Sequence, residues 1–302
     1  MNAKALYRQY CEEHDVPLFF RPSWLDLYNH DWQVVLESEL SVTLFFVYFP
    51  ENKFGFSFIR NPILTPYSGF LFSSSEIDEL TRNRLYERIL KLIPDVSVFY
   101  IDLLPEAGIR NIQSRFSCID KRTNLLDIQD MSQCLVNFKP ALQRQIRKAK
   151  KILQIIHSDD MERFYRLHSL TFQKQNLQPP YRIANFIKLW DYCKINQCGQ
   201  LLFAENENGE THAAMFLVYD EQTAYYLAGG TDEQYYGSGA MSYLMSYAIQ
   251  FAADEGCKQF DFEGSMIPGI NKFFQNFNPI ETHYISLQKM SPMYKIYRKL
   301  FH

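Results

Sequence analysis

The chain has 302 residues, of which 47% are hydrophobic and 16% are aromatic, and its formal net charge is −3. This length is comfortable for two domains, and the apolar content is enough to bury sizeable cores. The small net charge argues against bulk nucleic-acid binding, and DNA is not an expected partner. No run of about 18 apolar residues occurs, and the first ten residues lack an apolar signal segment. The sequence therefore predicts a cytoplasmic protein without an integral membrane segment.

The cysteines and histidines show no metal-binding spacing. No CxxC pair occurs, and Cys193 and Cys198 have no second pair that could complete a zinc site. No HExxH motif is present either. The sequence predicts reduced, buried thiols and no metal.

The first half of the chain predicts an antiparallel meander followed by a helix and a buried strand. The meander is expected from alternating, aromatic-rich segments, with a turn over residues 50–55. Serines before residue 76 can cap a helix that ends before Pro94. Helices are expected at 6–14, 24–28 and 76–93, and strands at 32–36, 42–49, 54–59, 96–103 and 122–128.

A proline-rich loop interrupts this half at residues 61–69, which read NPILTPYSG. Pro62 and Pro66 restrict its backbone, and Gly69 loosens it. From the residues alone, the segment is an irregular connection.

The most basic stretch of the chain lies at residues 139–151 and is expected to be a helix. Arg144, Arg147, Lys148 and Lys151 share one helical face, and apolar residues share another. This basic face is either a solvated surface or an anion-facing ridge for coenzyme phosphates or a tRNA backbone.

Helices and an antiparallel sheet are expected after this stretch. A helix over 160–174 carries His168, which we expect to be a packed histidine rather than a base. Strands are expected at 201–205, 213–219 and 223–228. The tail, residues 292–302, predicts an amphipathic basic helix that packs against the domain rather than on a membrane surface.

The segment from residue 223 to residue 264 predicts a crossover unit. A strand, the glycine loop QYYGSG at 234–239, an apolar helix ending at Gly256 and a second strand at 258–264 follow one another. This order implies a parallel strand pair. The loop leaves free backbone N–H groups at a helix N-terminus, which can hold an anionic group. Alternatively, it is a tight turn with glycines at positive φ.

The loop resembles the coenzyme A pyrophosphate loop of the GNAT superfamily of N-acetyltransferases, whose usual pattern is Q/R-x-x-G-x-G/A. Gln234, Gly237 and Gly239 match that pattern. The resemblance implies that acyl-CoA is a co-substrate held by Gln234, Gly237, Ser238, Gly239 and Ala240.

A second resemblance involves residues 261–278, which read DFEGSM, then GINKFFQNFN from residue 269. They are similar to the C-terminal signature of FemAB-like proteins, which have two tandem acetyltransferase-like folds and include the peptidoglycan bridge aminoacyl transferases. The usual pattern is G-x-x-x-F-K-x-x-F-G, but this chain has Phe274 at the lysine position and Asn278 at the last glycine. Lys272, two residues away, is a substrate-binding candidate.

The FemAB-like resemblance extends to other segments. Relatives often carry P-x-L-T-x-Y-x-G where this chain has residues 61–69, near the cleft between their domains, which implies that Tyr67 faces substrate. The basic segment is partly similar to their R-x-x-I-R-K-A-K helix. The implied fold is α/β, an α+β arrangement with mixed sheets, in two tandem GNAT-like domains. Residues 1–128 would form the domain without a donor loop, and residues 129–302 the domain with it.

Acyl transfer to an amine needs an unprotonated amine, an oxyanion stabiliser and a proton for the leaving group. Asp261 and Glu263 alternate with Phe260 and Phe262 on the last strand of the unit. Either acid could bind or deprotonate the amine, or be a structural acid. Tyr225, Tyr226 or Tyr284 could protonate the leaving group. No G-x-S-x-G elbow is present, and direct transfer without a covalent intermediate is expected.

Three functions remain open at this stage. The first is an N-acyltransferase that moves an acyl group from acyl-CoA to a small-molecule or peptide amine. The second is an aminoacyl-tRNA-dependent transferase that acts on a peptidoglycan precursor, with tRNA as a partner. The third is a non-catalytic binding protein of the same fold.

Overall fold

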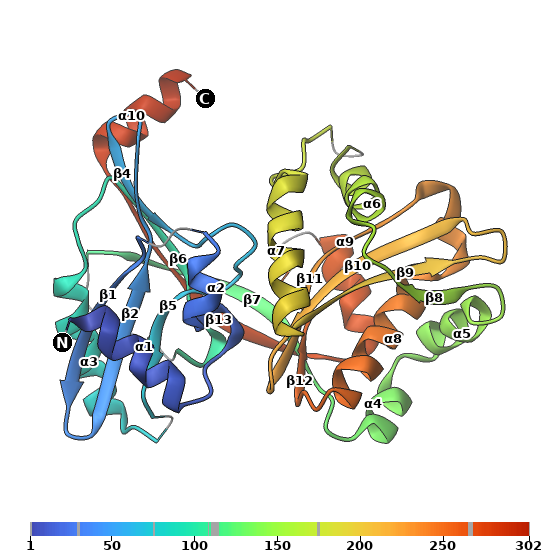
Figure 1. The fold of residues 1–302 in the computed structure, drawn as a ribbon, viewed down its shortest axis with the longest axis horizontal. Coiled ribbons are helices and arrows are strands. Elements are labelled where there is room, and N and C mark those ends of the chain that lie inside the picture. The colour runs from blue at the N-terminus through green and yellow to red at the C-terminus, as the bar shows by residue number, and fades with distance from the viewer. Residues whose placement is uncertain are drawn as a thin grey trace. The chain divides into compact units, whose positions relative to one another are not determined.

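The computed structural model describes residues 2–28, 31–74, 76–107, 109, 115–173, 176–264 and 268–301. Two compact units divide the chain: Met1–Lys121 with His283–His302, and Arg122–Thr282. The chain enters the second unit within β7 (Ser117–Asp127) and leaves it within β13 (Ile280–Met290) (Figure 1). The last strand and helix therefore belong to the first unit, whereas the sequence assigned all of 129–302 to the second domain.

The first unit contains two sheets. One is the antiparallel sheet β1-β2-β5, and the other has the order β3-β4-β6-β13 with β4 parallel to β6. Its elements are α1 (Ala3–Glu13), η1 (Leu18–Phe20), α2 (Pro22–Asp26), β1 (Gln33–Glu39), β2 (Val42–Tyr48), β3 (Pro50–Lys53), β4 (Phe56–Arg60), β5 (Gly69–Phe72), α3 (Glu79–Leu92), β6 (Val98–Asp102), η2 (Pro105–Ala107) and α10 (Pro292–Phe301).

The core of the first unit is aromatic. Phe46 packs on Phe70 and Phe99, with ring centroids 4.8 and 6.0 Å apart, and Tyr86 of α3 packs edge-on against Phe70. The predicted turn at 50–55 was partly wrong, because residues 50–53 pair with β4 and only Phe54 and Gly55 turn, both at positive φ. Such a two-residue turn matches the twist of its strands.

The second unit is a six-stranded mixed sheet, ordered β7-β12-β11-β10-β9-β8. Its further elements are α4 (Met131–Asn137), α5 (Pro140–Ala149), β8 (Gln154–His157), α6 (Met161–Gln173), α7 (Ile183–Asn196), β9 (Gly199–Glu205), β10 (Thr211–Tyr219), β11 (Thr223–Thr231), η3 (Glu233–Ser238), α8 (Ala240–Asp254), β12 (Gln259–Asp261), α9 (Pro268–Phe274) and η4 (Gln275–Phe277). β11 and β12 are parallel, which confirms the crossover unit.

Helices cover both faces of this sheet (Figure 1). All nine residues of the central strand β10 are buried. On one face Met215 joins the core that includes Leu244 of α8. On the other face Phe216 packs against Phe164 of α6 and Trp190 of α7. This burial fixes the register of β10 and β11, because a one-residue slip would exchange the two faces.

Candidate active site

The N-terminus of α8 opens where β11 ends, at the carboxyl edge of the parallel pair. Gly239 caps the helix with φ +77°. A Cβ added there would lie 2.8 Å from Gln145 Cγ of α5. Ser242 donates a 3.1 Å hydrogen bond to Gln145 Oε1. Glycine is therefore favoured at 239 both by its backbone conformation and by the approach of α5.

Several N–H groups in and around the loop are bonded locally, among them the Tyr235 N–H, which donates to the Asp232 carbonyl at 3.1 Å. Asp232 Oδ1 accepts from the backbone N–H of Gln234 at 3.1 Å, and Ser238 Oγ accepts from that of Ala240 at 3.2 Å. The helix provides no acceptor for the other N–H groups of its first turn. Gln234 and Gly237 are exposed, and a Cβ on Gly237 would meet open space. Among the loop residues predicted to hold the donor, Gly237 can thus be approached most closely by a ligand.

Glu263 follows the other strand of the pair and is held in an unusual conformation. Its φ is +50°, in the left-handed region that non-glycine residues rarely adopt. Asp261 Oδ1 accepts a 2.8 Å hydrogen bond from the Glu263 N–H and a short one from the Thr123 hydroxyl. Asp261 itself is 1% exposed. Non-glycine residues in such strained conformations concentrate at functional sites.

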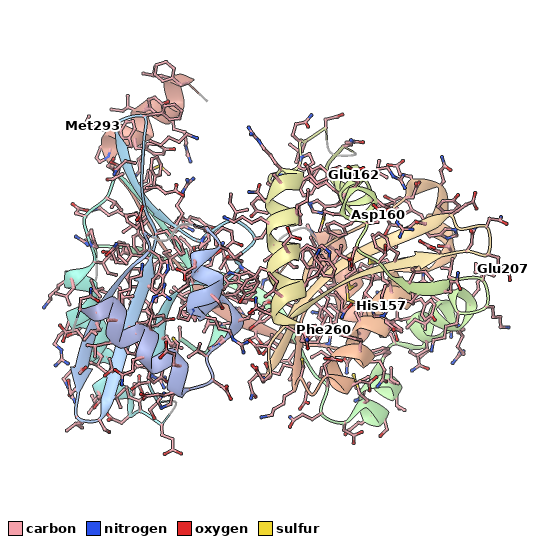
Figure 2. The ribbon with its side chains drawn as sticks, in the orientation of Figure 1. His157, Asp160, Glu162, Glu207, Phe260 and Met293 are labelled. Carbon is pink, nitrogen blue, oxygen red and sulfur yellow. The ribbon has the colours of Figure 1, made fainter. Side chains whose placement is uncertain are left out.

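The predicted alternation over 258–264 is only partly correct. β12 ends at Asp261, although Phe260 and Phe262 both enter the core as expected (Figure 2 labels Phe260). The Asp261 side chain bonds the backbone two residues ahead, and this local bond replaces a strand hydrogen bond. As a result the two acids differ: Asp261 is enclosed and satisfied, whereas Glu263 lies beyond the strand.

The Glu263 carboxyl group is partly isolated from other polar groups. Its Oε1 is buried without a hydrogen-bond partner in the described part of the chain. Burial raises the pKa of Glu263 well above its usual value, and the nearby charge of Asp261 raises it further. A carboxyl with a raised pKa is closer to the operating range of a general base near neutral pH.

Tyr226 lies on β11 close to Glu263. Burial raises the pKa of Tyr226, and the charge of Glu263 adds to this effect. A Cβ at Gly229 would overlap the Tyr226 hydroxyl, so glycine leaves room for that group. Tyr226 therefore remains protonated at neutral pH and can donate a proton.

β11 carries a bulge next to Tyr226 that the sequence did not reveal. Phe216 pairs with Ala228 and Leu217 pairs with Tyr226, which leaves Leu227 as the extra residue. β12 pairs with β11 only as far as Tyr225. Leu227 thus has no register partner on β10, and bulges commonly occur beside active sites.

The position of the family lysine is part of the core in this chain. Phe274 packs against Tyr226 and Phe262, with ring centroids 5.9 and 5.1 Å away. Lys272 lies on α9 with an exposed side chain, and its carbonyl accepts from Asn276. Lys272 therefore does not occupy the place of the missing lysine.

Residues of β7 that sequence reasoning missed hold the segment after β12. Asn124 accepts from the Phe262 N–H at 3.0 Å and donates to Asn271 Oδ1 at 2.8 Å. A Cβ on Gly264 would overlap the carbonyl of Arg122. The sequence signal for these β7 residues was a polar pair, Thr123 and Asn124, inside a predicted strand.

Two further candidate site residues from the sequence, Tyr67 and Tyr284, lie in the first unit. Their rings meet edge to face with centroids 5.4 Å apart, and Tyr67 is buried. Asn61 Nδ2 donates to the carbonyls of Thr65 and Pro66, which makes the 61–69 loop an ordered structure. Their expected roles in substrate binding and proton transfer stay predictions.

His168 is a packed histidine, as expected. It is buried between aromatic rings of α6 and α7, and its Nδ1 is 3.4 Å from the Gly229 carbonyl. Burial lowers the pKa of His168. The imidazole is therefore neutral at physiological pH.

No cluster of three or more His, Cys, Asp or Glu in the described ranges could hold a metal. None of the helices in those ranges has the length and apolar composition needed to cross a membrane.

The cysteines differ in burial. Cys118 is exposed and Cys11 is half-buried, whereas the other four are buried. The prediction that all six thiols are buried was therefore wrong for two of them.

Comparisons with known proteins agree with this geometry. Residues 137–273 match the family model for the Acetyltransferase (GNAT) domain. No curated protein matches the chain. The structure of FemX superposes with a TM-score of 0.66 at 11% identity, over 93% of this chain and 95% of that chain.

Two further structures resemble the chain at low identity. A conserved protein of unknown function from Bacteroides thetaiotaomicron has a TM-score of 0.55 at 13% identity, over 94% of this chain and 96% of that one. L-PGS from Bacillus licheniformis has a TM-score of 0.52 at 12% identity, over 95% and 92%. The chain thus has the FemAB-like α/β fold with two GNAT-like domains. The match of residues 137–273 to the GNAT acetyltransferase domain supports an N-acyltransferase.

Proposed function

We propose that the protein moves an acyl group from coenzyme A to a primary amine at the carboxyl edge of the β11–β12 pair. The observation that carries this proposal is the position of the α8 N-terminus and of Glu263, which both follow the carboxyl ends of the same two parallel strands. Ligands of α/β sheets commonly bind at that edge.

The donor's phosphates would lie at the N-terminus of α8. The helix dipole and the first-turn N–H groups that have no acceptor within the helix favour an anion there. The exposed basic residues of α5 reinforce this preference, because α5 packs directly against Gly239 through Gln145. Two acids precede the loop, Asp232, which lies 3.8 Å from Arg166, and Glu233.

The reacting groups would come from β11 and from the residues after β12. Glu263 in its ionised form removes a proton from the acceptor's ammonium group, and the neutral amine nitrogen then attacks the thioester carbon. The backbone at the Leu227 bulge is the group that we assign to stabilise the oxyanion. The C–S bond breaks as Tyr226 gives its proton to the departing sulfur, and the Tyr226 phenolate recovers a proton from the newly bonded nitrogen, which leaves a neutral amide and a thiol. Asp261 positions Glu263 rather than touching the substrate.

A second donor, an aminoacyl ester of tRNA, is supported by the resemblance to FemAB-like proteins and by the basic helix α5. Six basic residues on and around α5 are exposed: Lys139, Arg144, Arg147, Lys148, Lys150 and Lys151. The buried Phe274 speaks against it, since the signature of those proteins places a lysine there.

Calorimetric titration distinguishes the two donors. The proposal expects saturable binding of acetyl-coenzyme A and weaker binding of 3′-dephospho-coenzyme A, because fewer phosphates face the site. Binding of aminoacyl-tRNA without binding of acetyl-coenzyme A would replace the first donor with the second. Binding of neither would favour a non-catalytic protein.

A further inference from the structure

The helix α10 in the first unit leaves its apolar side chains in solvent. None of its residues is buried. Met293, Ile296, Leu300 and Phe301 are between 60% and 73% exposed. Met293, Ile296 and Leu300 are spaced three and four residues apart, so they form one ridge along the helix. Figure 2 labels Met293 on this helix.

A different face of α10 packs against β4, and these contacts fix the orientation of the helix. Tyr294 and Tyr297 each pack on Phe56 of β4 with ring centroids 5.1 Å apart, and Tyr294 also meets Phe58. The helix therefore does pack against its unit, as expected from the sequence, but only through this tyrosine face. The apolar ridge is a separate face that the unit does not cover.

Positive charge accompanies the ridge. Lys295, Arg298 and Lys299 are exposed, and α10 contains no acidic residue. Lys295 and Lys299 lie four residues apart, on the flank away from the tyrosines. The nearby acids Glu51 and Asp95 are in ion pairs with Arg60 and Lys289.

The turn between β3 and β4 adds a second apolar group at the same end of the unit. Phe54 is 69% exposed, and Lys53 Nζ lies 5.1 Å from its ring. Phe54 is two residues from Phe56, which holds α10. The first unit therefore presents an apolar ridge and an aromatic turn, both accompanied by lysines, and Phe56 links the two.

We propose that α10 and the Phe54 turn form a docking surface for an anionic phospholipid bilayer. An amphipathic helix with large apolar residues on one face and basic residues beside it lies in the membrane interface. Anionic headgroups attract the basic residues, whose long side chains can reach them while the ridge inserts. The charge of α10 is entirely positive, and this complementarity favours an anionic bilayer over a second copy of the chain. The inference does not depend on the acyltransferase chemistry.

Vesicle cosedimentation tests the surface. The full chain should sediment with vesicles of phosphatidylcholine mixed with phosphatidylglycerol, but not with phosphatidylcholine alone, and added salt should weaken the binding. The Ile296→Ser/Leu300→Ser variant should lose binding. Its matched control, Leu80→Ser/Ile195→Ser, changes equally exposed apolar residues elsewhere and should bind normally.

Charge variants give an independent measurement. Each basic residue removed from an anionic surface should lower partitioning roughly fivefold. Lys295→Glu/Lys299→Glu should therefore weaken binding far more than Lys91→Glu/Lys188→Glu. Equal binding by both charge variants would overturn the proposal, as would no binding of the wild type. Self-association without vesicles that Ile296→Ser/Leu300→Ser abolishes would assign the ridge to a second copy of the chain instead.

Discussion

Asp261 Oδ1 accepts a 2.8 Å hydrogen bond from the backbone N–H of Glu263. Asp261 is a fully buried carboxylate. Glu263 has a φ of +50°, and its own Oε1 has no hydrogen-bond partner among the described residues. The two neighbouring acids therefore have different physical roles: Asp261 shapes the backbone, and Glu263 presents the titratable group.

This division predicts opposite outcomes for two conservative substitutions. Glu263→Gln should lower acyl transfer about 10²–10⁴-fold, the usual contribution of a general base, without lowering Tm. Asp261→Asn should lower stability by about 1–3 kcal/mol, because an amide group would enter a buried acceptor site. Thermal unfolding and transfer of labelled acetyl to a panel of primary amines measure both. A Glu263→Gln variant that keeps full activity would remove Glu263 from the chemistry.

The pH dependence of stability gives a second prediction. The folded-state pKa of Glu263 is raised, so its favourable contribution is fully present below the usual pKa of about 4.3 and is lost as the pH rises through the folded value. Relative to Glu263→Gln, the wild type should lose stability with rising pH. Urea unfolding of both proteins over this range measures the difference, and a constant difference would contradict the raised pKa.

Tyr226→Phe tests the proton donor. The hydroxyl is the only group removed, and the ring contact with Phe274 remains. We expect kcat to fall by roughly 10²-fold or more, with a smaller change in KM. Tyr225→Phe, one residue earlier on the same strand, is the control. If the two variants have the same kcat, Tyr226 has no special role.

Gly230 and Gly237 provide a matched pair for stability. A Cβ at Gly230 would overlap the carbonyl of Leu167 and push β11 away from α6, whereas one at Gly237 meets open space. Gly230→Ala should cost about 1–3 kcal/mol or more, the usual range for overpacking, and Gly237→Ala should be nearly neutral. Differential scanning calorimetry compares the two, and equal Tm values would refute the packing of β11 against α6.

Local sequence patterns predicted the elements nearest the site. The strand, glycine loop, helix and strand order was enough to predict the parallel pair, and Gly239 does adopt positive φ. Local patterns could not reveal the bulge at Leu227, because it is a property of pairing with β10. Local patterns also could not distinguish the roles of Asp261 and Glu263. Asp261 accepts a hydrogen bond from Thr123, which is 138 positions away in the sequence.

The sequence also did not predict two short strands or the unit to which the end of the chain belongs, for similar reasons. β5 and β8 are four-residue strands at the ends of their sheets, too short for an alternating pattern to be distinctive. The end of the chain joins the first unit through pairing of β13 with β6, a long-range contact that no local motif encodes. The sequence could not predict that the α10 ridge is exposed, because this exposure depends on where the end of the chain packs in the first unit.

Binding of acetyl-coenzyme A to Gly237→Glu, measured by calorimetry beside the control Asn208→Glu, tests the central claim most directly. Gly237 is exposed at the proposed phosphate site, and Asn208 is exposed in the β9–β10 turn, so both variants add one negative charge without filling a core. The account predicts that Gly237→Glu loses binding and that Asn208→Glu binds like the wild type. Unchanged binding by Gly237→Glu would show that the donor does not lie at the N-terminus of α8.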